Sequence, residues 1–140
     1  MAQPTLPTTM QFALISPEAK LFDAPVFEVR CPGTEGEFGV RAGHMPLMAS
    51  LKPGVLYIQE ERNAPLTAMF VAGGFADVTP ELCTVLAEQA IPLAELNREA
   101  LEQEAANARE DMNAAADEAT RLIAQSALNL AQAKLQAIAA

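Results

Sequence analysis

The stretch Cys31-Pro-Gly-Thr-Glu-Gly-Glu-Phe-Gly-Val-Arg-Ala-Gly-His-Met-Pro-Leu47 decides how the chain is arranged. It holds four glycines, two prolines, two acids and the only histidine of the protein. Glycine permits positive φ, whereas proline fixes φ and removes a hydrogen-bond donor. The run therefore excludes a helix, and it is too long for a single tight turn. Because apolar segments flank it on both sides, we expect a shaped surface between strands.

Short apolar runs broken by turn residues extend from residue 10 to residue 90. Turn signals such as Ser16-Pro17, Lys52-Pro53-Gly54, Gly73-Gly74 and Thr79-Pro80 separate these runs. Regular short strands with a turn every 8 to 12 residues or so are typical of a β-sandwich or barrel. Residues 1–90 are therefore predicted to form a β-sandwich domain, and residues 1–9 a flexible arm.

The composition changes at Ile91-Pro92, and residues 93–140 contain no proline or glycine. We expect helix here, with Pro92 at its entry, where the missing donor costs nothing. A break within residues 111–117 would make Asp117 the N-cap of a second helix. The fold class is thus α+β: the sandwich, then a two-helix antiparallel hairpin over residues 91–140.

Apolar stripes run along both predicted helices. The first helix carries one stripe, made of Leu101, Ala105, Ala108 and Met112. The second helix carries two. One is made of Ala119, Leu122, Ile123, Ser126, Leu130, Ala133 and Ala137, and the other of Ala124, Leu128, Ala131 and Leu135. A helix that is apolar on two faces needs cover on both. A hairpin lying on the sandwich and an extended helix against a partner both satisfy this requirement.

Composition excludes several classes of protein. The net charge of −9 argues against a nucleic-acid partner, which would need basic patches over phosphates. No segment approaches the roughly 20 apolar residues of a membrane-spanning helix, and the N-terminus lacks the features of a signal peptide. Cys31 and Cys83 lie in apolar runs and are expected to be buried free thiols of a cytosolic protein.

The residues do not assemble into an active site. Gly33-x-x-Gly36-x-x-Gly39 lacks the Lys-Ser/Thr of a phosphate-binding loop and the helix of a dinucleotide fingerprint. His44 has no second histidine to share a metal. Glu35 and Glu37 point the same way if extended, and they are expected to be solvated or to meet a partner's polar groups. We therefore expect no metal, no cofactor and no catalysis; a hydrolase using His44 and Glu37 is the weakest alternative.

Several motifs resemble the epsilon subunit of the bacterial F-type ATP synthase. They are Leu14-Ile-Ser-Pro-Glu18, Pro32-Gly-Thr-Glu-Gly-Glu-Phe-Gly-Val40, Gly43-His-Met-Pro-Leu47, Leu51-Lys-Pro-Gly-Val55 and Val71-Ala-Gly-Gly-Phe-Ala76. These motifs keep the family's order over residues 10–90, and a helical tail follows them.

The resemblance implies a non-catalytic rotor subunit of the central stalk, with a flattened ten-stranded sandwich and a two-helix hairpin. Such a subunit binds the gamma subunit and the polar loops of the c-ring, and it couples proton transport to ATP synthesis. It is held peripherally, through the complex, at the cytoplasmic face of the inner membrane. The family's ring-facing edge matches Glu35, Gly36 and Glu37, and its gamma-facing surface matches His44 and its surroundings. Phe38 and Met45 complete the implied partner-binding residues. Valine at Gly36 or Gly39 is expected to weaken assembly through strain at positive φ.

The tail departs from this family. Some relatives bind ATP through an Ile-Asp-x-x-Arg-Ala motif, for which Ala94-Glu-Leu-Asn-Arg-Glu99 is a poor match. Glu95, Arg98 and Arg121 are thus weak candidates for nucleotide contact. Eight acids against four bases give residues 93–140 a charge of −4, which opposes both phosphates and the acidic loop of the beta subunit. We expect weak or no ATP binding, and weak regulation through the beta subunit. A stand-alone β-sandwich binding module with a helical partner-docking tail is the alternative.

Overall fold

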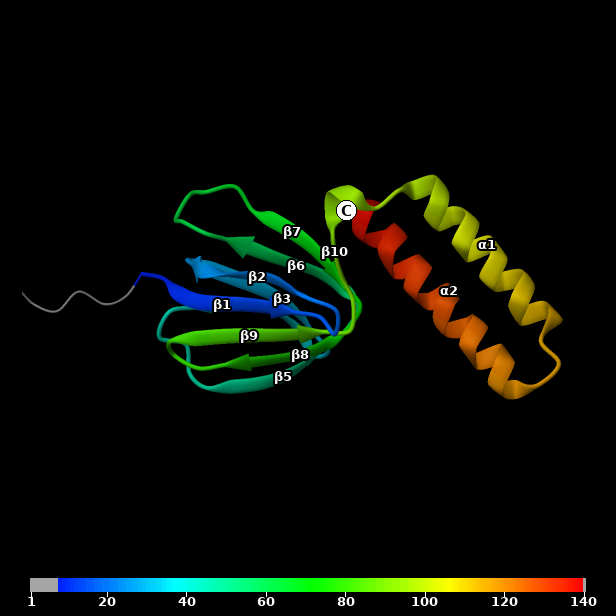
Figure 1. The fold of residues 1–140 in the computed structure, drawn as a ribbon, viewed down its shortest axis with the longest axis horizontal. Helices are drawn as coiled ribbons and strands as arrows, with labels where there is room; N and C mark the ends of the chain where they lie inside the picture. Colours follow the sequence, from blue (N-terminus) through cyan, green and yellow to red (C-terminus); the bar gives the residue numbers. More distant parts are fainter. Residues whose placement is uncertain (1–7, 140) are drawn as a thin grey trace, which may run out of the picture. The chain divides into compact units, whose positions relative to one another are not determined.

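The computed structural model describes residues 8–139, which divide into two compact units. The first unit ends at Ala90 and the second begins at Ile91 (Figure 1). The first consists of strands joined by short turns, and the second is mainly helical. The change of architecture coincides with the change of composition at Ile91-Pro92.

Ten strands follow one another in the sequence. They are β1 (Met10–Ile15), β2 (Lys20–Val26), β3 (Glu28–Gly33), β4 (Gly36–Arg41), β5 (Leu47–Leu51), β6 (Gly54–Gln59), β7 (Thr67–Val71), β8 (Gly74–Val78), β9 (Leu82–Ala87) and β10 (Ala90–Pro92). They form one continuous sheet in the order β10-β7-β6-β3-β5-β8-β9-β1-β2, with β4 paired to β3. The sheet folds on itself into the β-sandwich that the turn spacing predicts.

The two halves of the sheet meet at a single register pair. Gly33, the last residue of β3, pairs with Leu51, the last residue of β5. On one side of this link β3 pairs with β4 and β6; on the other, β5 pairs with β8. Gly33 is buried there, and a Cβ on it would lie 2.6 Å from the carbonyl oxygen of Gly36. Only glycine fits at this corner without a shift of the neighbouring backbone.

Inward-facing aliphatic side chains from both halves fill the sandwich. Alternation along the strands produces this core: in β9, for example, Cys83, Val85 and Ala87 are buried while Leu82 and Leu86 are exposed. Cys31 from β3 and Cys83 from β9 are buried free thiols, as expected. Burial raises the pKa of Cys83 to about 12 and that of Cys31 further. Neither thiol is reactive at neutral pH, because the thiolate is the nucleophile.

The second unit begins with a 3₁₀ turn (Leu93–Glu95), and helix α1 (Arg98–Ala114) starts only after it. The prediction that Pro92 opens the helix is therefore wrong. Leu96 and Asn97 are extended, and the Asn97 side-chain oxygen accepts the backbone N–H of Ala100 at 3.0 Å. Asn97 supplies the acceptor that a helix N-terminus needs, and proline has no such group.

The predicted break is present. Helix α1 ends at Ala114, and α2 (Glu118–Ala139) follows. The Asp117 carboxylate accepts the backbone N–H of Thr120 at 2.7 Å, and this bond holds the pKa of Asp117 below its ordinary value. Asp117 is thus the N-cap that the sequence predicts.

Inside the hairpin, α1 and α2 pack through small residues. The predicted α1 stripe is buried except for Met112, which is half-buried. The α2 stripe that holds Leu128 and Ala131 is likewise buried except for Leu135. On the other α2 stripe, however, the side chains of Leu122 and Ile123 are 54% and 73% exposed. The start of this second face of α2 is therefore uncovered, whereas Ala137 near its end is buried.

The Asp117 cap generates a pH-dependent prediction. Because the folded state lowers the pKa of this carboxyl, its stabilising effect is present at neutral pH and is lost as the pH falls through the folded pKa. Asp117→Ala should therefore speed hydrogen exchange in the first turn of α2 at neutral pH, and this difference should shrink in acid. Asp111→Ala, in the last turn of α1, should not have this effect. Equal effects of both changes would contradict the assignment of the cap.

Candidate partner-binding site

The β3–β4 hairpin carries most of the residues predicted to bind partners. Its register pairs Gly33 with Gly36, so Thr34 and Glu35 form a two-residue turn. Gly36 has φ of 136°, a conformation that favours glycine. The side chains of Thr34, Glu35 and Glu37 are exposed, whereas Phe38 is half-buried against the core. We call residues 34–37 the acidic turn; it is exposed, and Phe38, which follows it, packs against the core.

The turn is fastened to strand β5. The backbone N–H of Thr34 donates to the carbonyl oxygen of Ser50 at 3.0 Å, and the N–H of Lys52 donates to that of Pro32 at 2.9 Å. These two bonds flank the Gly33–Leu51 pair. Residues 33–38 and 47–50 together line a surface depression of about 550 Å³. The acidic turn is therefore held by backbone hydrogen bonds on either side of this register pair.

Two details of the sequence predictions need correction. Glu35 lies in the turn and Glu37 in β4, so strand geometry does not make them point the same way. Positive φ is confirmed for Gly36 but wrong for Gly39. At Gly39, glycine is favoured because a Cβ there would lie 3.1 Å from Oε1 of Glu28. The carboxylate of Glu28, which belongs to β3, lies next to Gly39 of β4.

The second predicted group, His44 and Met45, lies in the loop before β5. Gly43 has φ of 85°, and its N–H donates to the carbonyl oxygen of Pro80 at 2.8 Å. Nδ1 of His44 lies 2.6 Å from the carbonyl oxygen of Met45, whose side chain is 78% exposed. No hydrogen bond or ion pair joins His44 to Glu37 in residues 8–139. The structure therefore does not bring the residues of the hydrolase alternative into a catalytic pair.

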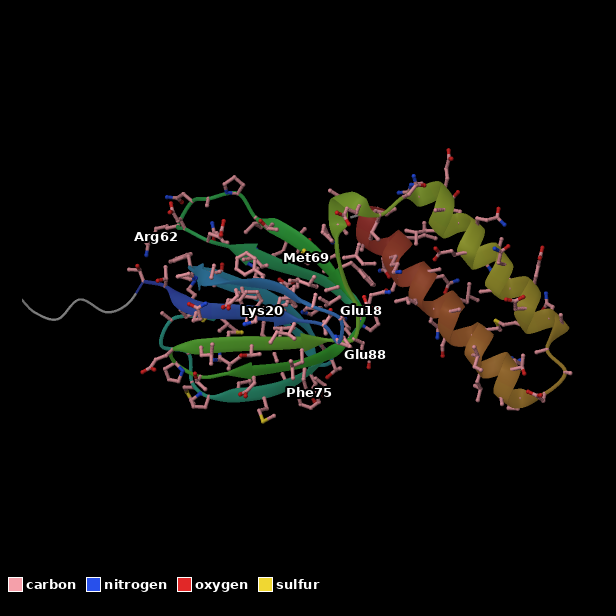
Figure 2. The ribbon with its side chains drawn as sticks, in the orientation of Figure 1. Glu18, Lys20, Arg62, Met69, Phe75 and Glu88 are labelled. Carbon is pink, nitrogen blue, oxygen red and sulfur yellow. The ribbon has the colours of Figure 1, made fainter. Side chains whose placement is uncertain are left out.

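An apolar surface beside the turn was missed by the sequence analysis. Phe75 of β8 pairs with Leu86 of β9, and Leu86 pairs with Ile15 of β1. We call these three residues, with Met48 of β5, the apolar row. The row points away from the core; Met48 is 68% exposed, and Phe75 lies on the outside of the sandwich (Figure 2). In the sequence, the only indication of the apolar row was the presence of apolar residues at outward positions of residues 74–87.

The apolar row and the acidic turn meet at one residue. Ser50 pairs with Phe75 of the row, and its carbonyl oxygen accepts the N–H of Thr34 in the turn. Met48 lies on the same face of β5, because side chains alternate along a strand. One edge of the sandwich therefore combines a rigid polar turn with exposed apolar side chains. Exposed apolar patches that are rimmed by polar residues mark interaction sites.

The structure separates the weak nucleotide candidates. Arg98 is the first residue of α1, whereas Arg121 lies in the first turn of α2 and pairs with Glu118 at 3.7 Å. In an antiparallel hairpin these helix starts are at opposite ends, about 25 Å apart for 17 residues at 1.5 Å each. Glu95 lies in the 3₁₀ turn before α1. The hairpin therefore does not assemble the three into one site.

Comparison with known proteins relates this arrangement to a family. Residues 9–93 match the family model described as "ATP synthase, Delta/Epsilon chain, beta-sandwich domain". An ATP synthase epsilon chain of Parvibaculum lavamentivorans is 48% identical over 103 residues, which cover 74% of this chain and 77% of the relative. One from Rhodospirillum rubrum is 41% identical over 129 residues, covering 92% and 96%.

The chain belongs to the ATP synthase epsilon-chain family. Epsilon chains are non-catalytic subunits of the synthase. Among solved structures, the Euglena gracilis mitochondrial ATP synthase (OSCP/F1/c-ring) contains a chain that is 27% identical, with a TM-score of 0.81. The match covers 99% of this chain and 86% of that one. A central-stalk/c-ring structure from Tetrahymena thermophila, 15% identical with a TM-score of 0.58, shares the fold.

Two observations on the epsilon-family chain concern metals and membranes. Within residues 8–139, no three His, Cys, Asp or Glu side chains gather closely enough to hold a metal ion. Over the same residues, neither α1 nor α2 has the length and apolar character needed to cross a membrane.

Proposed function

We propose that this chain is the central-stalk subunit that joins the gamma subunit to the polar loops of the c-ring and thereby couples proton transport to ATP synthesis. Membership of the epsilon family supports this function, and so does the likeness to a chain from a structure that includes F1 and the c-ring. The observation that carries the proposal is the junction at Ser50, where the apolar row meets the acidic turn.

The acidic turn is proposed to face the c-ring. Glu35 and Glu37 are exposed and offer carboxylates to the polar groups of the ring loops. Gly36, between them, allows close approach because it carries no side chain. The two hydrogen bonds to β5 and the packing of Phe38 resist deformation of the turn. A subunit that transmits torque needs such a stiff contact rather than a catalytic group.

The apolar row is proposed to bind gamma, together with His44 and Met45. Met45, Met48 and Leu86 each expose more than half of their surface. Burying exposed apolar area contributes about 25 cal/mol per Å², so these side chains are strong candidates for the centre of an interface. In this proposal the chain is held peripherally, through the complex, at the cytoplasmic face of the inner membrane.

The alternative function is a stand-alone β-sandwich binding module with a helical docking tail. Purification from native membranes separates the two functions. A stand-alone module would elute alone, whereas a stalk subunit would elute with the catalytic subunits of the synthase. The braced turn beside the apolar row favours the stalk, because a single docking surface would not need both.

Binding to purified gamma tests the proposed interface. Leu86→Glu places a charge in the apolar row and should weaken binding roughly tenfold or more, as expected for a residue at the centre of an interface. Leu66→Glu is the matched control: this leucine is 44% exposed but lies outside the row, just before β7. Gel filtration and calorimetry measure both complexes. Equal affinities for the two variants would contradict the assignment of the row to gamma.

The helical tail is predicted to be a weak regulator. Its charge, four bases minus eight acids or −4, opposes phosphates and an acidic loop of the beta subunit. The separation of Arg98 from Arg121 adds a second reason against a nucleotide site in the hairpin. Calorimetry should therefore detect weak or no ATP binding. Removing residues 93–140 should raise ATP hydrolysis by the complex only mildly, while ATP synthesis survives.

Two results would contradict this prediction. ATP binding at micromolar concentration would mean that the hairpin offers phosphate contacts beyond its few bases. A large rise in hydrolysis after truncation would mean that the tail engages the catalytic head despite its charge. Arg121→Gln, which removes one of the two bases in α2, is the informative variant in either case.

A further inference from the structure

A polar pocket lies at the end of the β3–β4 hairpin that is remote from the acidic turn. It has a volume of about 260 Å³ and is lined by residues from β3, β4 and the β6–β7 region: Phe27, Glu28, Arg30, Arg41, Gln59, Arg62 and Asn63. The whole chain has nine lysines and arginines and a net charge of −9. Three of those nine cations therefore converge on one small pocket, and the proposed contacts with gamma and the c-ring do not use them.

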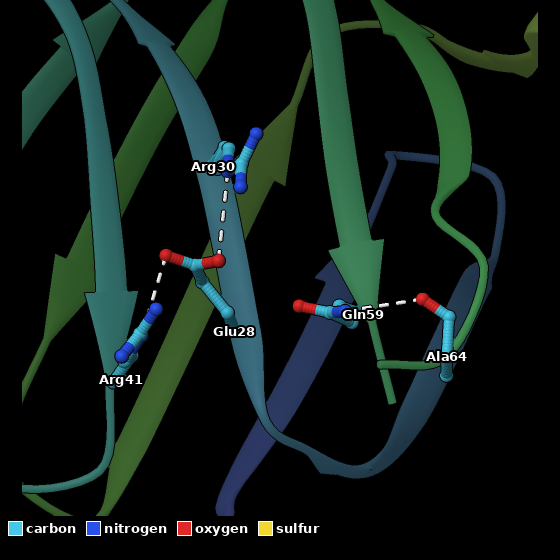
Figure 3. Close-up of polar contacts among 5 residues, drawn as sticks. All are labelled: Glu28, Arg30, Arg41, Gln59 and Ala64. Atoms are coloured by element: carbon cyan, nitrogen blue, oxygen red, sulfur yellow. Dashed lines mark hydrogen bonds and ion pairs between the residues drawn. The ribbon is translucent and has the colours of Figure 1, made fainter. Parts of the chain in front are cut away.

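The carboxylate of Glu28 forms ion pairs with two of the arginines. Oε2 of Glu28 lies 3.5 Å from Nε of Arg30, and Oε1 lies 3.4 Å from Nε of Arg41 (Figure 3). The Glu28 side chain is only 12% exposed, and the missing side chain of Gly39 leaves room for it. Glu28 thus pairs with two guanidinium groups, whose side chains are 43% and 60% exposed, and neutralises only one of their charges.

An aromatic ring holds the third arginine near the second. Cζ of Arg41 lies 4.8 Å from the centroid of the Phe27 ring, and Cζ of Arg62 lies 5.3 Å from it. Arg62 forms no ion pair with any residue in the range 8–139. Glu60 and Glu61 precede Arg62 in the chain but do not line the pocket. Three positive charges and one negative charge leave a surplus of +2.

We propose that this arginine pocket binds a phosphoryl group, supplied by free phosphate, because the end of the hairpin that is proposed to face the membrane ring is the opposite one. Guanidinium groups present paired N–H donors that match phosphate oxygens, and charge-assisted bonds of this kind are strong. A phosphate carries about −1.5 to −2 at neutral pH, which balances the surplus charge. A carboxylate carries only one negative charge and would leave a guanidinium unmatched. Glu28 and Phe27 place the three guanidinium groups around one pocket, so binding requires less rearrangement of their side chains.

Titration of the full-length protein with inorganic phosphate at constant ionic strength tests the site. Saturable NMR shifts are expected at the backbone amides of Phe27, Gln59 and Asn63. Arg62→Gln should weaken binding roughly tenfold, because it removes one charge-assisted contact. Arg62→Lys keeps the charge but loses the fork, so its affinity should fall between the two. Arg109→Gln, which removes a charge from α1, is the matched control and should bind like the original chain.

The proposal is overturned if phosphate binding does not depend on Arg62, or if Arg109→Gln weakens binding as much. It is also overturned if acetate at the same ionic strength binds as tightly as phosphate.

Discussion

The pairing of Gly33 with Leu51 is the constraint on which the rest of the sandwich depends. It joins the half of the sheet that contains β3, β4 and β6 to the half that contains β5, β8 and β9. The two inward faces meet because the sheet turns at this point. A side chain at position 33 would collide with the carbonyl oxygen of Gly36, so the corner requires glycine. Closure of the core and the position of the acidic turn therefore have the same cause.

The same corner explains how one edge of the molecule combines two kinds of surface. Strand β5 leaves the corner with Ser50 bound to the turn and Met48 exposed beside Phe75 and Leu86. The turn cannot shift without breaking backbone hydrogen bonds to β5. In the proposed function, this stiffness lets one small subunit hold two partners in a fixed relation. The core behind it is aliphatic, and its two thiols are unreactive.

Much of the fold was accessible from the sequence because its signals are local. Glycine and proline mark the turns, alternation marks the strands, and an aspartate that precedes an apolar run marks the second helix. The start of the first helix was misplaced because Pro92 and Asn97 both suit a helix N-terminus. Only the observed 3₁₀ turn at Leu93–Glu95 decides between them. Which residue provides a cap depends on the path of the chain, and periodicity does not report that path.

The candidate sites were accessible only in part. The residues of the acidic turn are consecutive, so the sequence displays them together. The apolar row combines residues 15, 48, 75 and 86, and the arginine pocket combines Arg30, Arg41 and Arg62. Those residues meet only because strand pairing and the turn after β6 bring separate parts of the sequence together. The role of Gly39 was misjudged for the same reason, because the side chain that it accommodates, Glu28, belongs to the neighbouring strand.

Disulfide crosslinking in the assembled synthase tests the central claim most directly. Both native cysteines are buried, so Glu37→Cys adds the accessible thiol. A cysteine in the polar loop of the c-subunit should crosslink rapidly to Glu37→Cys. The same c-subunit cysteine should not crosslink to Glu61→Cys, because Glu61 lies beyond the opposite end of the β3–β4 hairpin, in the loop before β7. The crosslink should leave the rotor intact, because both partners turn together. Efficient crosslinking of Glu37→Cys to the catalytic head, with none to the ring, would contradict the account.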